Sequence, residues 1–316
     1  MVAGIGLFGL PAAPQWWMVP IIISLVGVGS GLIDAVTNAQ TSLHRSLGYM
    51  GWLHASWAAG AAIGPPLIAL SLALSSSWRL GFAAMGFAFA AVAAFVGREG
   101  GHRASVAGNP LPTPALEQIS PKVGRPLLLL AGLFLLGAGL EATAGDWAYS
   151  QLTLGRGLSA QVASLAASLF WAGLGAGRVA LGLLGNRASP TLVLDGSIAL
   201  TLIASLSFWF APPLACAIIA LPLIGVAVSV FFPVLLSITP TRVGREMTSH
   251  AVGYGLAAGT VGAGGIPAIG GIILQSLGLL TLGPLLVVIA GALAVLHALS
   301  RRSGDGQRSA PPAADR

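Results

Sequence analysis

The chain has 316 residues, of which 55% are hydrophobic and only 8% are charged, and its mean hydropathy is +0.87. A soluble domain carries about a quarter charged residues, so this composition excludes an ordinary water-soluble protein. The net charge of +6 does not indicate nucleic-acid binding, because the basic residues stand in short loops between apolar runs. The single cysteine, Cys216, excludes an internal disulfide and a thiolate metal cluster, and no cofactor is expected.

Apolar runs of about twenty residues recur along the chain, which is the length that a helix needs to cross a membrane. The period-two alternation that is typical of an outer-membrane barrel is absent. The sequence therefore predicts an all-α polytopic membrane protein. The first apolar segment, roughly residues 1–13, is too short to span, and full spans are predicted at about 16–44, 50–75, 78–97, 125–151, 158–186, 189–211, 213–239, 246–275 and 278–300.

One long polar stretch divides the chain. The expected parts are a partial N-terminal helical half (1–97), a cytoplasmic linker (98–124), a six-helix C-terminal half (125–300) and a disordered cytoplasmic tail (301–316). Of the 15 basic residues, twelve fall on one side of the predicted spans, two (Arg79 and Arg156) fall on the other, and Arg178 lies within a span. This bias places the linker and the C-terminus in the cytoplasm and the spans in the cytoplasmic (inner) membrane.

The two halves contain an internal repeat. The stretch GVGSGLIDAVTN…HASWAAGAAIGPP (27–66) has an echo in GVAVSVFFPVLL…GYGLAAGTVGAGGIP (225–267), at an offset of about 199 residues. A six-helix repeat joined by a long cytoplasmic loop resembles the organisation of major facilitator transporters. Six predicted spans follow the loop and about three and a half precede it, so we expect a chain truncated by about 75 residues at its N-terminus. The alternative is a complete nine-span protein of another class.

Four stretches are similar to the fucose-permease-like branch of that superfamily. They are Asp34-Ala-Val-Thr-Asn38, LHASWAAGAAIGPP (53–66), GLEATAGDWAYSQL (139–152) and FWAGLGAGRVALGLLGNR (170–187). The resemblance implies a sugar or similar polar solute, and it implies proton coupling through the acid of the first stretch. The last stretch also resembles the cytoplasmic signature G-x-L-a-D-r-x-G. Arg187 matches that signature, whereas Asn186 stands where it has Asp.

Asp34 and Asn38 lie one turn apart on one helix face. A carboxylate at mid-membrane is costly by about 2.5–3.5 kcal/mol on insertion scales. We therefore expect Asp34 to titrate or to bind substrate on a cavity wall, next to Asn38. The alternative is that the two residues form polar contacts that hold two helices together. Glu141 is a second candidate for the cavity or a gate, the alternative being a hydrogen bond to a neighbouring helix. His54 is a third, although a histidine at a helix end is often a simple hydrogen-bonding group.

Arg178 has several possible roles. It can bind an anionic substrate, pair with Glu141 or Asp34, or anchor backbone carbonyls at the inner gate, and we favour a structural or gating role. Asn186 and Arg187 in the following loop are assigned the same kind of role. Small residues at intervals of four allow helices to approach closely, and prolines kink them. This assigns packing and kinks to Gly60, Gly64, Pro65, Gly255, Gly259 and Pro267.

These observations predict a secondary active transporter that moves a small, neutral, polar solute by alternating access, coupled to protons. It is expected to be monomeric, with the solute, protons and the lipid bilayer as its partners. A drug/proton antiporter is an alternative, because Gly60-x-x-x-Gly64-Pro65 resembles the antiporter motif, although Ile68 and Ala69 stand where a Gly pair would follow. A non-transporting membrane fragment is another. The sequence shows no metal-ligand spacing and no nucleophile–base pair, so no enzyme is predicted.

Overall fold

The computed structural model describes residues 2–104 and 121–308, and every regular element in that part of the chain is helical. Eight helical segments there are long and apolar enough to cross a membrane: Met18–His44, Arg79–Arg98, Gly124–Gly155, Ala160–Arg187, Pro190–Phe210, Pro213–Val243, Thr248–Leu277 and Leu279–Arg301. They coincide with eight of the nine predicted spans, so the predicted all-α, multi-pass class is confirmed. The ninth prediction, 50–75, corresponds to the helix Leu47–Ser75, which is not among these eight.

Close contacts divide the chain into two compact units. Unit 1 takes the described residues of Met1–Thr37 and Trp57–Gln118, and unit 2 those of Asn38–Ser56 and Ile119–Arg316. This division differs from the predicted halves, because residues 38–56 pack with the C-terminal helices. Most of the predicted linker, 105–120, and the end of the predicted tail, 309–316, lie outside the described residues.

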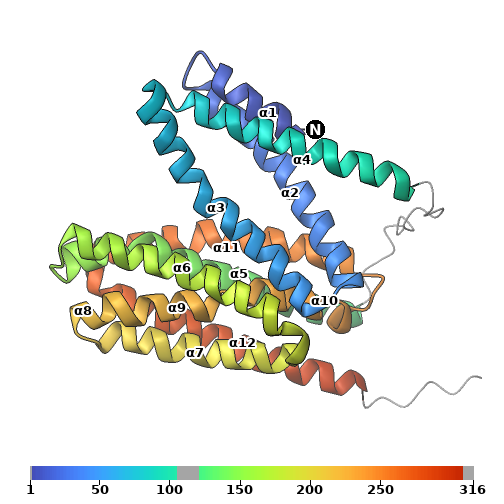
Figure 1. Cartoon of the computed structure of the whole chain (residues 1–316). Coiled ribbons are helices and arrows are strands. Elements are labelled where there is room, and N and C mark those ends of the chain that lie inside the picture. Colours follow the sequence, from blue (N-terminus) through green and yellow to red (C-terminus); the bar gives the residue numbers. More distant parts are fainter. Residues whose placement is uncertain (1, 105–120, 309–316) are drawn as a thin grey trace, which may run out of the picture. The chain divides into compact units, whose positions relative to one another are not determined.

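Unit 1 contains α1 (Val2–Ala12), the first part of α2 (Met18–His44), most of α3 (Leu47–Ser75) and α4 (Arg79–Ala104), which are labelled in Figure 1. Helix α1 packs against α4, with the rings of Phe8 and Phe87 edge to face at 5.2 Å. Ser71 secures the turn between α3 and α4: its Oγ donates to the carbonyl of Ser77 at 2.5 Å and accepts from the N–H of Gly81 at 2.8 Å.

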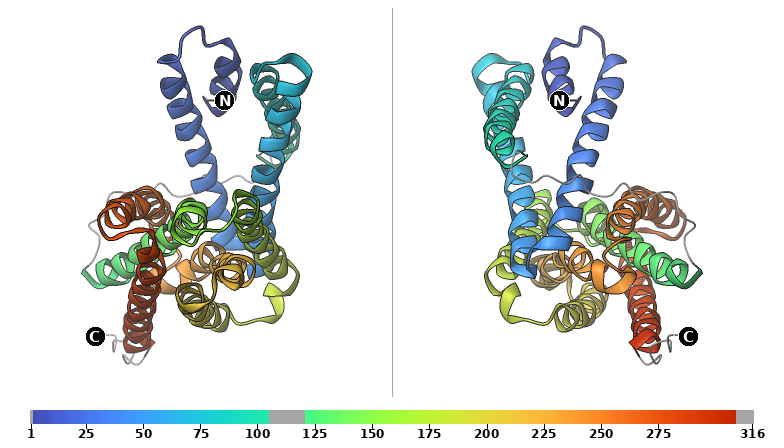
Figure 2. Two further views of the ribbon diagram at one scale, coloured as in Figure 1. Left: turned by 90° about the vertical axis from the view of Figure 1, so that its left-hand side faces the viewer. Right: turned by 90° about the vertical axis from the view of Figure 1, so that its right-hand side faces the viewer.

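Unit 2 is a helical bundle around α5 (Pro121–Ser150), which packs against α6, α10, α11 and α12. The elements are η1 (Gln151–Gly155), α6 (Ala160–Leu184), η2 (Gly185–Arg187), α7 (Pro190–Phe210), α8 (Pro213–Ala215), η3 (Cys216–Ala220), α9 (Leu221–Val228), α10 (Phe231–Val243), α11 (Thr248–Leu277), η4 (Leu279–Thr281) and α12 (Leu282–Arg308). Figure 2 shows these helices from two opposite sides. The core contains fully buried rings of Phe134, Phe170, Phe208 and Phe231.

Both arginines on the predicted outer side cap the C-terminal end of a helix. The Arg156 guanidinium donates to the carbonyls of Ala211, Phe208 and Trp209 at 2.7, 2.7 and 3.0 Å, at the end of α7. Arg79 donates to the carbonyls of Pro11 and Ala13 at 3.0 and 3.1 Å, at the end of α1. The last carbonyls of a helix have no partner within it and carry partial negative charge, so a cation there is favourable.

At the predicted cytoplasmic end of unit 2, a cluster of polar groups binds α12 to its neighbours. The carboxylate of Asp195 on α7 pairs with His297 Nε2 and Arg301 Nη1 on α12, each at 2.6 Å. Arg242 at the end of α10 donates to the carbonyl of Ser300 at 2.8 Å. On the other side of the bundle, the thiol of Cys216 is fully buried and donates to the carbonyl of Phe208 at 3.3 Å.

Helices α6 and α9 approach so closely that glycine is required where their backbones meet. A Cβ at Gly173 would stand 2.6 Å from the carbonyl oxygen of Pro222, and one at Gly225 would overlap the carbonyl of Phe170. Real Cβ atoms do not come so close to backbone, so any side chain at these positions forces the helices apart. Gly175, on another face of α6, has open space around it.

We therefore expect Gly173→Ala to destabilise the protein by about 1–3 kcal/mol, the usual effect of overpacking a well-packed core. Gly175→Ala is the matched control on the same helix, and it should be neutral or slightly stabilising because alanine favours helix more than glycine does. Thermal unfolding of the detergent-purified variants measures both. Equal melting temperatures for the two would contradict the close approach.

Candidate functional site

The candidate span Pro213–Val243 is interrupted near its middle. Helix α9 ends at Val228, a turn follows at Ser229 and Val230, and α10 starts at Phe231. The cause is visible in the sequence, because Pro233 stands four residues after Ser229. In an α-helix the N–H of residue 233 would donate to the carbonyl of Ser229, but proline has no N–H and its ring displaces that carbonyl. The break therefore leaves a backbone acceptor inside the hydrocarbon region, where it needs another donor.

Arg178 supplies that donor from α6. Its Nε donates to the carbonyl oxygen of Ser229 at 3.4 Å, and its Nη2 lies 3.6 Å from Oε1 of Glu141 on α5. The side chain of Arg178 is 5% exposed and that of Glu141 is 17% exposed. Gly177 makes the approach of α6 to the break possible, because a Cβ there would overlap the side chain of Ser229. Three elements thus meet at one buried cation, which carries a carboxylate and a backbone carbonyl as partners.

His54 lies near this pair, on the part of α3 that belongs to unit 2. Its imidazole is 6.3 Å from the ring of Phe232 on α10, and it is near enough to Arg178 to interact electrostatically. Nε2 of His54 is buried and has no hydrogen-bond partner among the described residues. A buried nitrogen of this kind is unfavourable unless it binds something, so it is a candidate contact for a solute or a proton.

The start of α3 is held by the loop after α6. Oδ1 of Asn186 accepts a hydrogen bond from the backbone N–H of Gly48 at 3.1 Å. Gly48 is the second residue of α3, and the first N–H groups of a helix have no partner within it, so Asn186 satisfies one of them. A Cβ at Gly51 would stand 2.5 Å from the backbone nitrogen of Gly182, which shows how closely the two helices cross. Arg187, the other loop residue predicted for this role, is exposed.

Asp34 and Asn38 lie on α2 at the division between the units. Asp34 is exposed in unit 1, and Asn38 is 1% exposed in unit 2. Both residues interact with other groups of the protein. Of the sequence-predicted polar residues, the structure brings Glu141, Arg178 and His54 together in unit 2. Asp34 belongs to the other unit, and its role stays a prediction.

The predicted packing residues have different surroundings. A Cβ at Gly255 would be 2.7 Å from the ring of Phe134, and one at Gly259 would be 2.6 Å from the ring of Phe232, so α11 lies tightly against α5 and α10. Pro267 is buried in α11, where its carbonyl accepts from the indole N–H of Trp147 at 2.9 Å. A Cβ at Gly60 would meet no described atom within 4 Å, one at Gly64 would only touch Met85, and the side chain of Pro65 lies outside the described set.

Sequence reasoning missed the carbonyl of Ser229 and the hydrogen bond from Gly48 to Asn186. The first had a readable signal, since a proline inside an apolar span frees the carbonyl four residues earlier. The second had none, because the two residues are 138 positions apart. Within residues 2–104 and 121–308, no group of three or more His, Cys, Asp or Glu side chains is placed to hold a metal ion.

No protein-family model and no curated protein matches this sequence. Among solved structures, the chain is similar to a major facilitator superfamily transporter, FucP, in its outward conformation, with a TM-score of 0.74 and 14% identity. The match covers 96% of this chain and 80% of that one. A variant of the E. coli fucose:proton symporter FucP matches over the same shares, with a TM-score of 0.71 and 14% identity. The predicted resemblance is therefore confirmed for the fold alone.

The Glu141–Arg178 pair can be tested with a double-mutant cycle. Glu141→Leu alone leaves a buried cation without its carboxylate and should destabilise the protein by about 3–5 kcal/mol. Glu141→Leu combined with Arg178→Met removes both charges, and it should recover part of that loss, giving a coupling free energy of about 1–3 kcal/mol. Unfolding by SDS in mixed micelles measures each variant. Strictly additive effects would show that the two side chains do not interact.

Proposed function

We propose that this protein is a secondary transporter that moves a small, neutral, polar solute across the membrane by alternating access, coupled to protons. The observation that carries the proposal is the buried Glu141–Arg178 pair beside a broken helix, in a fold shared with major facilitator transporters. Broken helices in transporters expose backbone groups to a mid-membrane binding site. The proposed place is the cytoplasmic (inner) membrane.

The pair offers a chemical basis for proton coupling. When Glu141 is ionised, it balances the charge of Arg178, and the pair carries no net charge. When Glu141 takes up a proton, the ion pair is lost, whereas the hydrogen bond from Arg178 to the carbonyl of Ser229 does not depend on that charge. Each proton therefore changes the charge and the hydrogen bonding of the site, which is what coupling requires. Asp34, in the other unit, is proposed as the second titrating group.

A neutral solute fits these partners. Arg178 is engaged by Glu141 and by Ser229, so it does not present an unbalanced charge to an ion. We propose that Nε2 of His54, which is buried without a partner among the described residues, exchanges a hydrogen bond with a hydroxyl group of the solute. One of the structural neighbours is a fucose:proton symporter, which supports a sugar-like solute for this chain as well. The contact between Asn186 and Gly48 is proposed as the latch that closes the cytoplasmic side.

Transport in proteoliposomes tests the coupling. Asp34→Asn should abolish proton-driven uptake of the solute while expression and folding are retained. Glu141→Gln keeps a hydrogen-bonding group but cannot titrate, so it should retain solute exchange between the two sides and lose accumulation driven by a pH gradient. Neutral monosaccharides and polyols are the first solutes to screen, with an internal pH-sensitive dye to follow proton movement. Unchanged accumulation in both variants would overturn the proposed coupling.

The proposed latch can be tested separately. Asn186→Asp places a negative charge at the positive N-terminal end of α3 and should stabilise the contact with Gly48 by about 0.3–1 kcal/mol. We expect a slower turnover of solute with little change in expression. Asn186→Leu removes the acceptor and tests the opposite change, because it should reduce the stability of the contact with Gly48. If both variants turn over at the rate of the native protein, the contact has no role in gating.

A further inference from the structure

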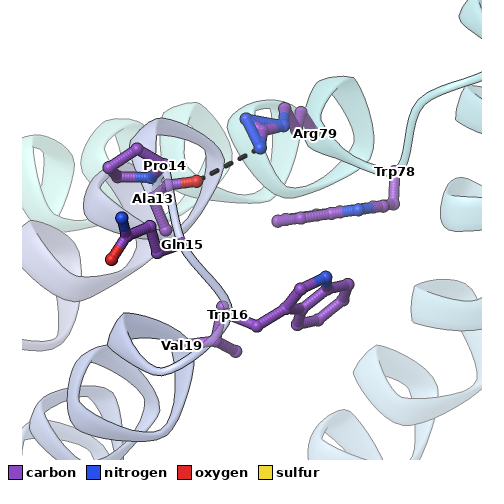
Figure 3. Close-up of a pocket in the computed structure, with 7 residues that line it drawn as sticks. All are labelled: Ala13, Pro14, Gln15, Trp16, Val19, Trp78 and Arg79. Atoms are coloured by element: carbon purple, nitrogen blue, oxygen red, sulfur yellow. Dashed lines mark hydrogen bonds between the residues drawn. The ribbon is translucent and has the colours of Figure 1, made fainter.

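Unit 1 contains a small pocket that shares no residue with the proposed transport site. It has a volume of about 140 Å³ and is lined by Ala13, Pro14, Gln15, Trp16, Val19, Trp78 and Arg79 (Figure 3). Two of the candidate spans start here, at Met18 and at Arg79. The pocket therefore lies at the end of the hydrophobic segments, at the level where a membrane presents its headgroups.

The walls of this pocket are held in place by polar contacts. Arg79 donates to the carbonyls of Pro11 and Ala13, as described above, and its guanidinium lies 5.2 Å from the centre of the Trp78 ring. The rings of Trp16 and Trp78 are 6.2 Å apart, with an angle of 34° between their planes. The indole N–H of Trp17 donates to Oε1 of Gln15, so the amide oxygen of Gln15 already has a donor.

The pocket offers hydrogen-bond donors and little that can accept. The indole N–H groups of Trp16 and Trp78 donate to no other residue within the described part of the chain. A guanidinium has five N–H donors, and Arg79 uses one on each of the two carbonyls of α1. Within the described part of the chain, Arg79 forms no ion pair with a carboxylate. Asp34, the only acidic residue before Glu99 in the sequence, lies roughly 22 Å along α2 from Val19.

The donors and the positive charge of the pocket favour one class of ligand over others. A sugar needs acceptors as well as donors for its hydroxyl groups, and a quaternary ammonium group would be repelled by Arg79. An oxyanion uses only donors and is attracted by the cation. Indole rings also prefer the boundary between headgroups and acyl chains, where one edge is apolar and the other is polar. We propose that the pocket binds the phosphate of a phospholipid headgroup, with Arg79 supplying charge and the two indoles supplying donors.

Native mass spectrometry of the full chain in detergent tests this proposal with two lipids that share their acyl chains. Phosphatidylglycerol carries the phosphate, and diacylglycerol lacks it. The variant Trp16→Phe/Trp78→Phe keeps the aromatic rings and the Arg79 cap of α1 but removes both N–H donors. Trp209→Phe changes an aromatic residue in the other unit, where Trp209 stacks on Phe210 at 4.5 Å, and is the matched control.

We expect the native chain and the Trp209→Phe control to retain phosphatidylglycerol over diacylglycerol. The double variant should lose roughly tenfold or more of its affinity for phosphatidylglycerol, because it lacks the two hydrogen bonds to a charged group. Equal retention by the native chain and the double variant would overturn the proposal. Displacement of the lipid by soluble glycerol phosphate at equal concentration would overturn the assignment to a lipid. Thermal unfolding of the double variant close to that of the native chain excludes misfolding as the cause of the loss.

Discussion

A single backbone carbonyl, that of Ser229, determines much of the arrangement inside unit 2. The proline four residues later removes its normal donor, and a carbonyl in hydrocarbon must find another one. Arg178 provides it from α6, and the buried guanidinium in turn needs the carboxylate of Glu141 on α5. The glycine at position 177 is small because α6 must lie against the break. One missing N–H thus accounts for a buried arginine, a buried acid and a close crossing of helices.

The need of a backbone carbonyl for a donor also explains the two arginines on the predicted outer side. In both units, an arginine on the predicted outer side is bound to the last carbonyls of a helix, Arg79 on α1 and Arg156 on α7. These two residues are the exceptions to the positive-inside pattern, and each has a structural reason to be there. The bilayer therefore acts on the sequence in two ways. Basic residues are scarce in the predicted outer loops. A cation is retained there where the last carbonyls of a helix have no donor within the helix.

The spans were predictable from the sequence because apolar length alone determines them, and their chain order suggested the fold. The pairing of Glu141 with Arg178 was one of several possibilities, since a one-dimensional pattern does not say which acid lies next to an arginine. Residues 38–56 belong to unit 2 for a reason that cannot be read from the local sequence. Gly48 and Gly51 fit against Gly182 and the loop at Asn186, and this close fit depends on residues more than a hundred positions away.

The thiol of Cys216 has a practical meaning for this chain. It is the only cysteine in the sequence, it is completely enclosed, and it donates to the carbonyl of Phe208. Reagents that modify thiols from water need an exposed thiolate, which this residue does not offer. A cysteine introduced into any loop would then be the single reactive thiol of the folded variant. Spin or fluorescent probes can thus be attached at a chosen loop position without first replacing Cys216 in the core.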